Sequence, residues 1–288
     1  MSAERTERFR TENRTLDIDG RVHEYRLLGE RAGPLVVLIS GLRAPLDSWE
    51  AVFNPLSCSH AVIACNRPGV GRSAKPTVAQ SGGRIVADGL RLLEELALEP
   101  PYVLVGHSIG GLYANLAART VPASIAGVVL VESAFPHEDR LYEGLPRPLL
   151  LRTFGGAIAL IEKLRGNAGR FAEANFVEQT STEVERAPPF PPVPLAVVSG
   201  ERSMPMVPAE ATRIHRACQT RLLALSPIAR RFSASTSGHA PQITEPDVVI
   251  EAIEWVLDAS RATAPARGPA DRSVAATETD RAPPSPSA

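Results

Sequence analysis

Ser108 is the residue best placed to act as a nucleophile. It lies in the run GHSIGG at 106–111, which follows the apolar residues 102–105 and precedes a helix-like stretch at 112–120. Where a G-x-S-x-G sequence turns sharply from strand to helix, the glycines leave room for the turn and the serine hydroxyl is exposed. That hydroxyl attacks a carbonyl only when an imidazole accepts its proton and a carboxylate orients the imidazole. The sequence therefore predicts a serine nucleophile that needs a histidine and an acid.

Strands and helices that would position Ser108 alternate along most of the chain. Short apolar or alternating runs predict the strands, and apolar positions at helical spacing predict the helices. Asp19-Gly20 predicts a hairpin turn between the first two strands, and a loop rich in Gly, Pro and Ser is expected after residue 39. The expected strands are 14–18, 22–28, 34–39, 61–65, 102–105, 127–131, 195–199 and about 228–233; the expected helices are 85–98, 112–120, 208–218 and 246–260. This alternation predicts an α/β fold with a mostly parallel central sheet flanked by helices.

An insertion interrupts this alternation. Between residues 135 and 190, helical segments near 149–164 and 170–179 lie among Pro and Gly, which predicts a small helical cap or lid. The core would then comprise residues 14–134 and 191–260. Residues 1–13 are expected to form a flexible arm. Residues 261–288 contain almost no large apolar side chain, so a disordered tail is expected there.

Composition excludes several classes of function. The chain has 288 residues, 44% of them hydrophobic, which suits one large α/β domain. A formal net charge of -1 without a basic stripe argues against nucleic-acid binding, and no apolar run approaches membrane-spanning length. The first residues are rich in Arg and Glu, unlike a secretory signal, so a cytoplasmic location is expected. The three cysteines have neither disulfide-framework nor metal-ligand spacing and are interpreted as buried thiols.

These features together resemble the α/β-hydrolase superfamily over about residues 14–260. Ser40-Gly41-Leu42 stands where that family places its oxyanion loop, and the run NRPGVGRS at 66–73 resembles the family's D-x-P-G-x-G-x-S turn, with Asn66 replacing Asp. The elbow around Ser108 and the loop Ser237-Gly238-His239 complete the likeness. One departure concerns chemistry. The family commonly carries its catalytic acid in G-x-x-D after the strand at 195–199, and this chain has Gly-Glu-Arg-Ser at 200–203.

His239 is the predicted general base. It lies in a loop of small residues between the last strand and the final helix, which matches the order serine, acid, histidine in the resembled family. His107 flanks the nucleophile and is expected to pack beneath the turn or touch substrate. His137 stands at the start of the insertion and could line the pocket. Structural roles are expected for the other three histidines, His23, His60 and His215.

Two carboxylates compete for the role of the acid. Catalytic groups gather at the carboxyl ends of parallel strands, and Glu132 and Glu201 both follow a predicted strand. Glu132 comes after the strand next to the nucleophile's strand, a placement that resembles some haloalkane dehalogenases. Glu201 stands only one residue past its glycine, where the family's usual acid stands three past. Glu132 is therefore preferred, with Glu201 as the alternative.

The resemblance also implies the groups that would surround a substrate. In the family, backbone N–H groups of the residue after the nucleophile and of the oxyanion loop stabilise the oxyanion, which here implies Ile109 and Leu42. Gly41 would let the loop approach closely. Trp49 could line the floor of the pocket together with Leu42, or both could belong to the core. Gly41, His107, Trp49 and His137 are thus the expected substrate-binding residues.

The expected function is serine hydrolysis of an ester or related acyl bond in a small to medium, uncharged substrate. No metal or organic cofactor is implied, and the sequence does not indicate an oligomeric state. The same triad in the resembled family also serves C–C bond hydrolases, lactonases, thioesterases and cofactor-free haloperoxidases. Dehalogenases and epoxide hydrolases use Asp where this chain has Ser108. A hydrolase fold that serves only as a receptor or binding module is the alternative from another class.

Overall fold

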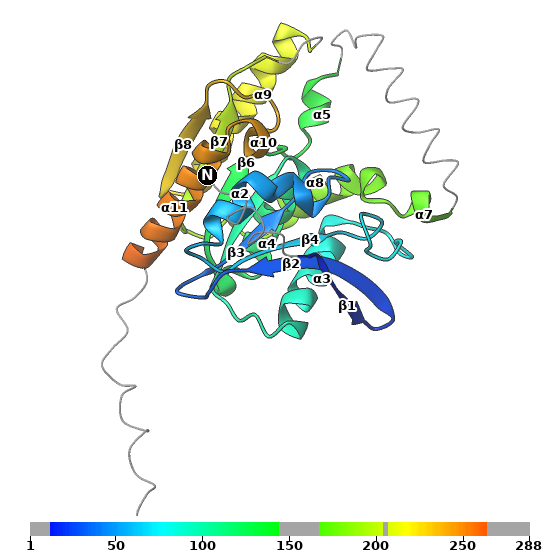
Figure 1. Cartoon of the computed structure of the whole chain (residues 1–288). Helices are drawn as coiled ribbons and strands as arrows, with labels where there is room; N and C mark the ends of the chain where they lie inside the picture. Colours follow the sequence, from blue (N-terminus) through cyan, green and yellow to red (C-terminus); the bar gives the residue numbers. More distant parts are fainter. Residues whose placement is uncertain (1–11, 144–166, 204–206, 264–288) are drawn as a thin grey trace, which may run out of the picture.

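The computed structural model describes residues 12–143, 167–203 and 207–263 and contains one eight-stranded sheet (Figure 1). The strand order is β1-β2-β4-β3-β5-β6-β7-β8. Strand β2 pairs antiparallel with β1 and β4, and the remaining neighbours pair in parallel. The strands are β1 Arg14–Ile18, β2 Arg21–Leu28, β3 Leu35–Ile39, β4 Val62–Asn66, β5 Tyr102–His107, β6 Ile125–Val131, β7 Leu195–Gly200 and β8 Ala229–Ala234. The predicted α/β architecture is confirmed.

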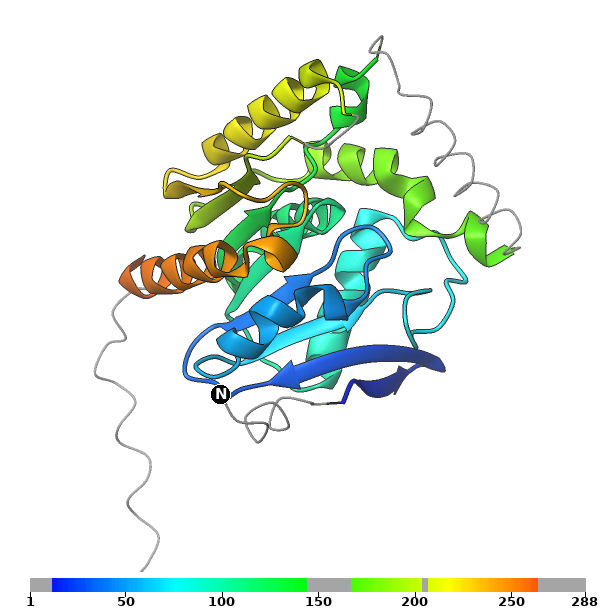
Figure 2. The ribbon, with the colours of Figure 1, turned by 45° about the horizontal axis from the view of Figure 1, so that its top comes forward.

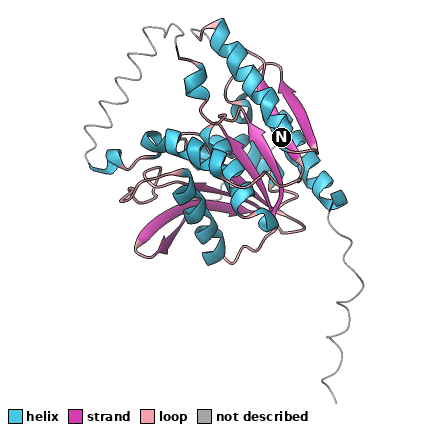
Figure 3. Cartoon of the chain, turned by 180° about the vertical axis from the view of Figure 1, so that it is seen from behind, coloured by secondary structure: helices cyan, strands magenta, loops and turns pink. Residues whose placement is uncertain are grey.

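Helices cover both faces of the sheet. Helices α2 and α11 pack on one face, and α3, α4 and α9 pack on the other (Figures 2 and 3). The α-helices are α2 Glu50–Leu56, α3 Gly82–Glu95, α4 Ile109–Thr120, α5 Glu138–Leu141, α7 Asn167–Arg170, α8 Val177–Arg186, α9 Ala209–Leu222, α10 Pro241–Thr244 and α11 Pro246–Thr263. The short 3-10 helices are η1 Leu46–Trp49, η2 Pro122–Ser124, η3 Glu173–Phe176 and η4 Leu223–Leu225.

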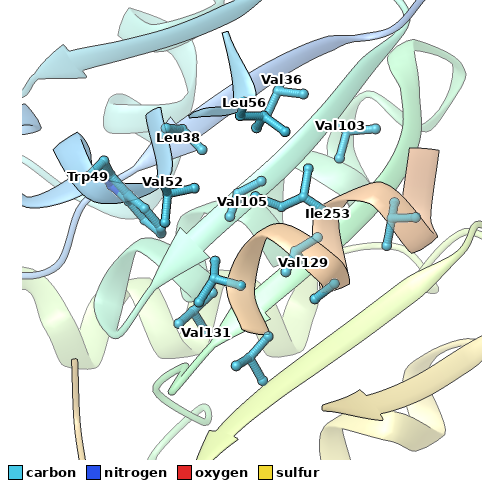
Figure 4. Close-up of a cluster of buried hydrophobic side chains, with 14 of the residues drawn as sticks. Val36, Leu38, Trp49, Val52, Leu56, Val103, Val105, Val129, Val131 and Ile253 are labelled. Atoms are coloured by element: carbon cyan, nitrogen blue, oxygen red, sulfur yellow. The ribbon is translucent and has the colours of Figure 1, made fainter. Parts of the chain in front are cut away.

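The inner strands are rigid because both of their faces are buried. Figure 4 shows side chains of α2 and α11 packed on valines from β3, β5 and β6. Val105, Val129 and Ile253 are fully buried in this cluster. Complete burial of each such side chain contributes about 1.5–3 kcal/mol. Strands β5 and β6 therefore provide a fixed support for the residues at their carboxyl ends.

The amino-terminal hairpin forms as expected. Ile18 pairs with Arg21, and the two residues between them have positive φ, 53° at Asp19 and 76° at Gly20. Two successive positive φ values are what a two-residue turn of the Asp-Gly kind requires. This hairpin extends the sheet at the edge away from β7 and β8.

Some local expectations need correction. The segment after β3, predicted to be a loop, contains η1 and α2, because Leu46, Val52 and Leu56 bury an apolar stripe that its Pro and Ser residues obscured. Of the cysteines interpreted as buried, Cys58 is exposed and Cys65 is partly exposed. The helix expected at 170–179 is divided among α7, η3 and α8. The expected helix at 149–164 and most of both terminal segments lie outside the described residues, although α11 continues to Thr263.

The described part of the insertion packs directly on the core. Val184 of α8 is buried against Ile85 of α3 and Leu112 of α4. Helix α8 is thereby held against the first turns of α3 and α4, and α4 begins at the carboxyl end of β5. Among the described residues, no helix is both long enough and apolar enough to cross a bilayer.

Candidate active site

Ser108 lies at the sharp turn between β5 and α4. Its backbone has φ 53° and ψ −123°, a conformation that residues other than glycine rarely adopt. Neighbouring backbone leaves no room for a Cβ on either flanking glycine: an added atom would lie 2.4 Å from the Gly110 oxygen at Gly106, and 2.3 Å from the Ile39 oxygen at Gly110. The rare backbone conformation of Ser108 costs on the order of 1–3 kcal/mol and persists only where the surrounding packing enforces it. The turn leaves Ser108 partly exposed.

His239 reaches the serine from the loop between β8 and α10. Its Nε2 lies 3.1 Å from the Ser108 Oγ, a distance suited to proton transfer. The loop is held on two sides. The Nε2 of His107 donates to the carbonyl of His239 at 2.6 Å, and Gly238 approaches so closely that a Cβ on Gly200 would lie 2.1 Å from its oxygen.

Glu132 stands directly after β6 and completes the arrangement. Its Oε2 lies 3.5 Å from the Nδ1 of His239, and its Oε1 accepts the Gly200 N–H at 2.8 Å. Burial opposes the negative charge, but hydrogen bonds with His215, His239 and the Gly200 N–H outweigh it and lower the pKa of Glu132 to about 2. The carboxylate is therefore ionised throughout the neutral range, as the orienting acid of a serine nucleophile must be.

The alternative acid occupies a different environment. Glu201 is exposed, and its backbone N–H donates to the carbonyl of Ala234 at the end of β8. The structure thus brings Ser108, His239 and Glu132 together and leaves Glu201 at the surface.

His215 also belongs to this cluster, although the sequence suggested only a structural role. Its Nε2 lies 3.0 Å from the Glu132 Oε2, and its Nδ1 lies 2.7 Å from the Oε1 of Glu138 in α5. Helices α5 and α9 lie side by side in Figures 1 and 2. The only available signal was helical spacing, since His215 precedes the buried Gln219 and Leu222 by one and two turns of α9.

Gly41 lies in the loop after β3 that was expected to supply an oxyanion donor. A Cβ on Gly41 would lie 2.8 Å from the His107 Nδ1 and 3.4 Å from the Ser108 Cβ, so the loop touches the nucleophile's turn. Leu42 follows with 44% of its surface exposed, whereas Ile109 is buried at the start of α4. Leu42 therefore lies outside the core.

A buried arginine fixes this loop, and sequence reasoning missed it. Arg67 donates to the carbonyl of Ser40 at 2.8 Å and to that of Gly41 at 2.6 Å. Its guanidinium also donates to both oxygens of Glu173 in η3, at 2.6 and 3.1 Å. Burial alone would lower the pKa of Arg67, but the charge of Glu173 outweighs it and raises that pKa. Glu173 in turn accepts the backbone N–H of Arg43 at 2.8 Å, so the insertion and the loop share one ion pair.

The remaining expected substrate-binding residues lie away from open space. Trp49 is fully buried, with its ring edge-on to that of His107 at 6.4 Å between centroids. Burial lowers the pKa of His107 to about 4, so its ring is neutral at pH 7. His137 is buried and lies 3.1 Å from the carboxylates of Glu178 and Glu185 in α8. Trp49 and His107 therefore pack behind the His239 loop, and His137 is held by α8.

A comparison of the sequence with family models identifies this architecture. The model described as alpha/beta hydrolase fold matches residues 34–181, more than half of the chain. The chain belongs to the α/β-hydrolase fold family.

Individual relatives of this α/β-hydrolase are distant. The chain is 34% identical over 119 residues to the dihydrolipoyllysine-residue acetyltransferase component of the acetoin cleaving system of Cupriavidus necator, covering 40% of this chain and 30% of the relative. It is 26% identical over 171 residues to the human (Homo sapiens) 1-acylglycerol-3-phosphate O-acyltransferase ABHD5, covering 51% and 49%. The chain thus spans less than half the length of these curated relatives.

Solved structures share the fold. The crystal structure of Cfl2 from Burkholderia cenocepacia is similar with a TM-score of 0.63 at 17% identity, over 85% of this chain and 95% of that one. At this identity the similarity concerns the arrangement of strands and helices alone.

Proposed function

We propose that this α/β-hydrolase is a serine hydrolase that cleaves an ester or related acyl bond through an acyl-enzyme on Ser108. The observation that carries the proposal is the 3.1 Å contact between the Ser108 Oγ and the His239 Nε2, backed by the buried Glu132 carboxylate. A partly exposed, strained serine beside an imidazole and an ionised acid is the arrangement that activates a hydroxyl. A binding module would need none of these three groups.

The proposed reaction follows from this geometry. His239 accepts the Ser108 proton at Nε2 as Oγ attacks the acyl carbonyl, while Glu132 stabilises the imidazolium that forms. The backbone N–H groups of Leu42 and Ile109 would stabilise the oxyanion, and loss of one such donor costs about 3 kcal/mol. The imidazolium then gives its proton to the leaving group. A water molecule deprotonated by His239 finally attacks the acyl-enzyme and releases the acid and the free serine.

One feature supports an uncharged substrate, and another supports an acyl group. Glu132 is paired with His215, and Arg67, which holds the Gly41 loop, is paired with Glu173, so neither ion pair offers an unpaired charge to a charged substrate. Both curated relatives also carry names that describe acyl transfer. We further propose that residues 135–190 form the cap over the acyl group, because Glu138 and Glu173 link this segment to both sides of the site.

A substrate panel tests the proposal. Purified protein is assayed with matched p-nitrophenyl esters, thioesters, lactones and amides, alongside Ser108→Ala as the control. The expected result is turnover of at least one ester series by the wild type, and a rate for Ser108→Ala that is lower by at least about 10³-fold. Equal rates for the two folded proteins would contradict the proposal and favour a binding module. Faster turnover of lactones or thioesters would redirect the substrate class while keeping the mechanism.

A further inference from the structure

Five side chains form a continuous row that extends the three expected catalytic groups. The row runs from Ser108 through His239, Glu132 and His215 to Glu138, so that imidazoles and carboxylates alternate. The side chains of Glu132 and Glu138 are only 6% and 10% exposed, and that of His215 is 23% exposed. The described mechanism uses the first three members and leaves the last two without a role.

Geometry fixes the protonation state of His215. Its Nε2 faces an oxygen of Glu132 and its Nδ1 faces an oxygen of Glu138. An ionised carboxylate only accepts hydrogen bonds, so each ring nitrogen must carry a proton, and a ring with two N–H groups is an imidazolium. Burial opposes that charge, but the two carboxylates outweigh it and raise the pKa of His215 to about 10.

Glu138 is anchored independently of His215. Its Oε2 accepts the backbone N–H of Phe135 at 3.0 Å, and its Oε1 accepts the hydroxyl of Tyr142. Because α5 holds this carboxylate in place, Glu138 fixes the His215 ring from the side opposite to Glu132. The contact between His215 and the Glu132 Oε2, at 3.0 Å, is shorter than the 3.5 Å contact that the same oxygen makes with His239.

We propose that His215, held as an imidazolium by Glu138, is a positioning residue that keeps the Glu132 carboxylate turned toward His239. The inference rests on the proposed serine hydrolase function. His215 holds the same Oε2 that faces the His239 Nδ1, and the Gly200 N–H holds the other oxygen. With both oxygens held, the carboxylate cannot rotate away from the base.

Other titratable or charged groups surround this pair. His239 also faces His107, which burial keeps neutral at pH 7. Near Glu138, burial raises the pKa of Tyr142 and raises the pKa of the Cys218 thiol to about 11, so both are neutral there. The guanidinium of Arg216 donates to the carbonyl of Glu201, and that of Arg221 stacks on Phe135. His215 is therefore the charged side chain next to Glu132 that can be substituted without changing Ser108 or His239.

Comparison of kcat with KM tests this role. His215→Leu removes the N–H donor to Glu132, so kcat should fall by about 10- to 100-fold while KM stays within about twofold, because Glu132 contacts the base and not the substrate. His215→Gln retains an N–H donor for Glu132 and should recover part of the lost kcat. Arg213→Gln is the matched control, because it removes an exposed cation of α9 that pairs with Glu210, and it should leave kcat unchanged. Equal losses of kcat in His215→Leu and His215→Gln would overturn the positioning role.

A second readout keeps the inference separate from the hydrolase assignment. The Nδ1–H proton of His239, which faces Glu132, is observed by NMR in the wild-type protein, His215→Leu and Glu138→Leu, with no substrate present. Loss or an upfield shift of this resonance in His215→Leu supports the inference even if no ester is turned over. An unchanged resonance in folded His215→Leu overturns it, whatever the activity. If His215→Leu does not fold, Glu138→Leu, which removes the far-side partner of the His215 ring, decides by the same criterion.

Discussion

Two buried ionic clusters flank Ser108, and they differ in whether their cation can titrate. The acid cluster consists of Glu132, His215 and Glu138, and the loop cluster consists of Arg67 and Glu173. In each cluster, the segment between β6 and β7 supplies a carboxylate to a cation of the core. Glu138 faces His215 of α9, and Glu173 faces Arg67 in the turn after β4. The cation is a histidine in the acid cluster and an arginine in the loop cluster.

This difference separates two tasks in one site. An arginine keeps its charge at every ordinary pH, so the loop cluster can fix the position of Gly41 but cannot respond to protons. An imidazolium between two carboxylates can lose its proton as pH rises, so the acid cluster can respond to protons. The Arg67 side therefore positions the Gly41 loop at every pH, whereas the His215 side positions the Glu132 carboxylate only while His215 is protonated.

The largest effect is expected from removing the charge of Glu132. Glu132→Gln keeps the shape of the side chain but no longer stabilises the His239 imidazolium, so kcat should fall by about 10³–10⁴-fold. Glu201→Gln is the matched control, because its carboxylate is exposed, and kcat should stay within about twofold of the wild type. The kcat of both variants is measured with the ester that the wild type hydrolyses fastest. A large loss in Glu201→Gln alone would identify Glu201 as the acid and remove the acid cluster from the mechanism.

A smaller but substantial effect is expected when the loop cluster is broken. Arg67→Met leaves the Glu173 carboxylate buried without its cation, and the free energy of unfolding should fall by about 3–5 kcal/mol. Arg67→Met combined with Glu173→Leu should recover part of this stability in urea denaturation, because no buried charge is then left unpaired. The double variant should still have a reduced kcat, since the carbonyls of Ser40 and Gly41 lose their donor. Full activity in the double variant would show that Arg67 does not position the loop.

The smallest expected effect concerns stability at alkaline pH. Because the pKa of His215 is raised from 6.5 to about 10, its stabilising contribution is complete below about pH 6.5 and is lost as pH rises through 10. The stability difference between wild type and His215→Gln should therefore shrink by roughly 2 kcal/mol between pH 7 and pH 10.5. The difference between wild type and Arg67→Met should stay constant over the same range. Parallel curves for both variants would contradict the distinction between the clusters.

The sequence was sufficient for those parts of the site that local geometry determines. Ser108 is recognisable because a strand-to-helix turn requires glycines around it, and short apolar or alternating runs predicted the strands of the sheet. The position of Glu132 followed from its place directly after a buried strand. Such features depend on residues close together in the chain.

The two clusters depend on contacts between distant residues, which one sequence does not reveal. His215 reaches Glu132 only because α9 packs beside β7 and α5, and Arg67 meets a carboxylate more than a hundred residues later in the chain. Both cations look like ordinary surface residues when composition and periodicity are the only guides. Helix α2 was missed for a related reason, since its apolar stripe is recognisable only against the sheet face that it covers.

Covalent labelling of Ser108 tests the central claim most directly. The intact protein is treated with a fluorophosphonate, and the modified peptide is identified by mass spectrometry in the wild type and in His239→Gln. We expect one adduct, on the peptide that contains Ser108, forming at least about 10³-fold more slowly in His239→Gln. A folded wild-type protein that is not labelled, or is labelled equally fast without His239, would contradict the claim that this imidazole activates Ser108.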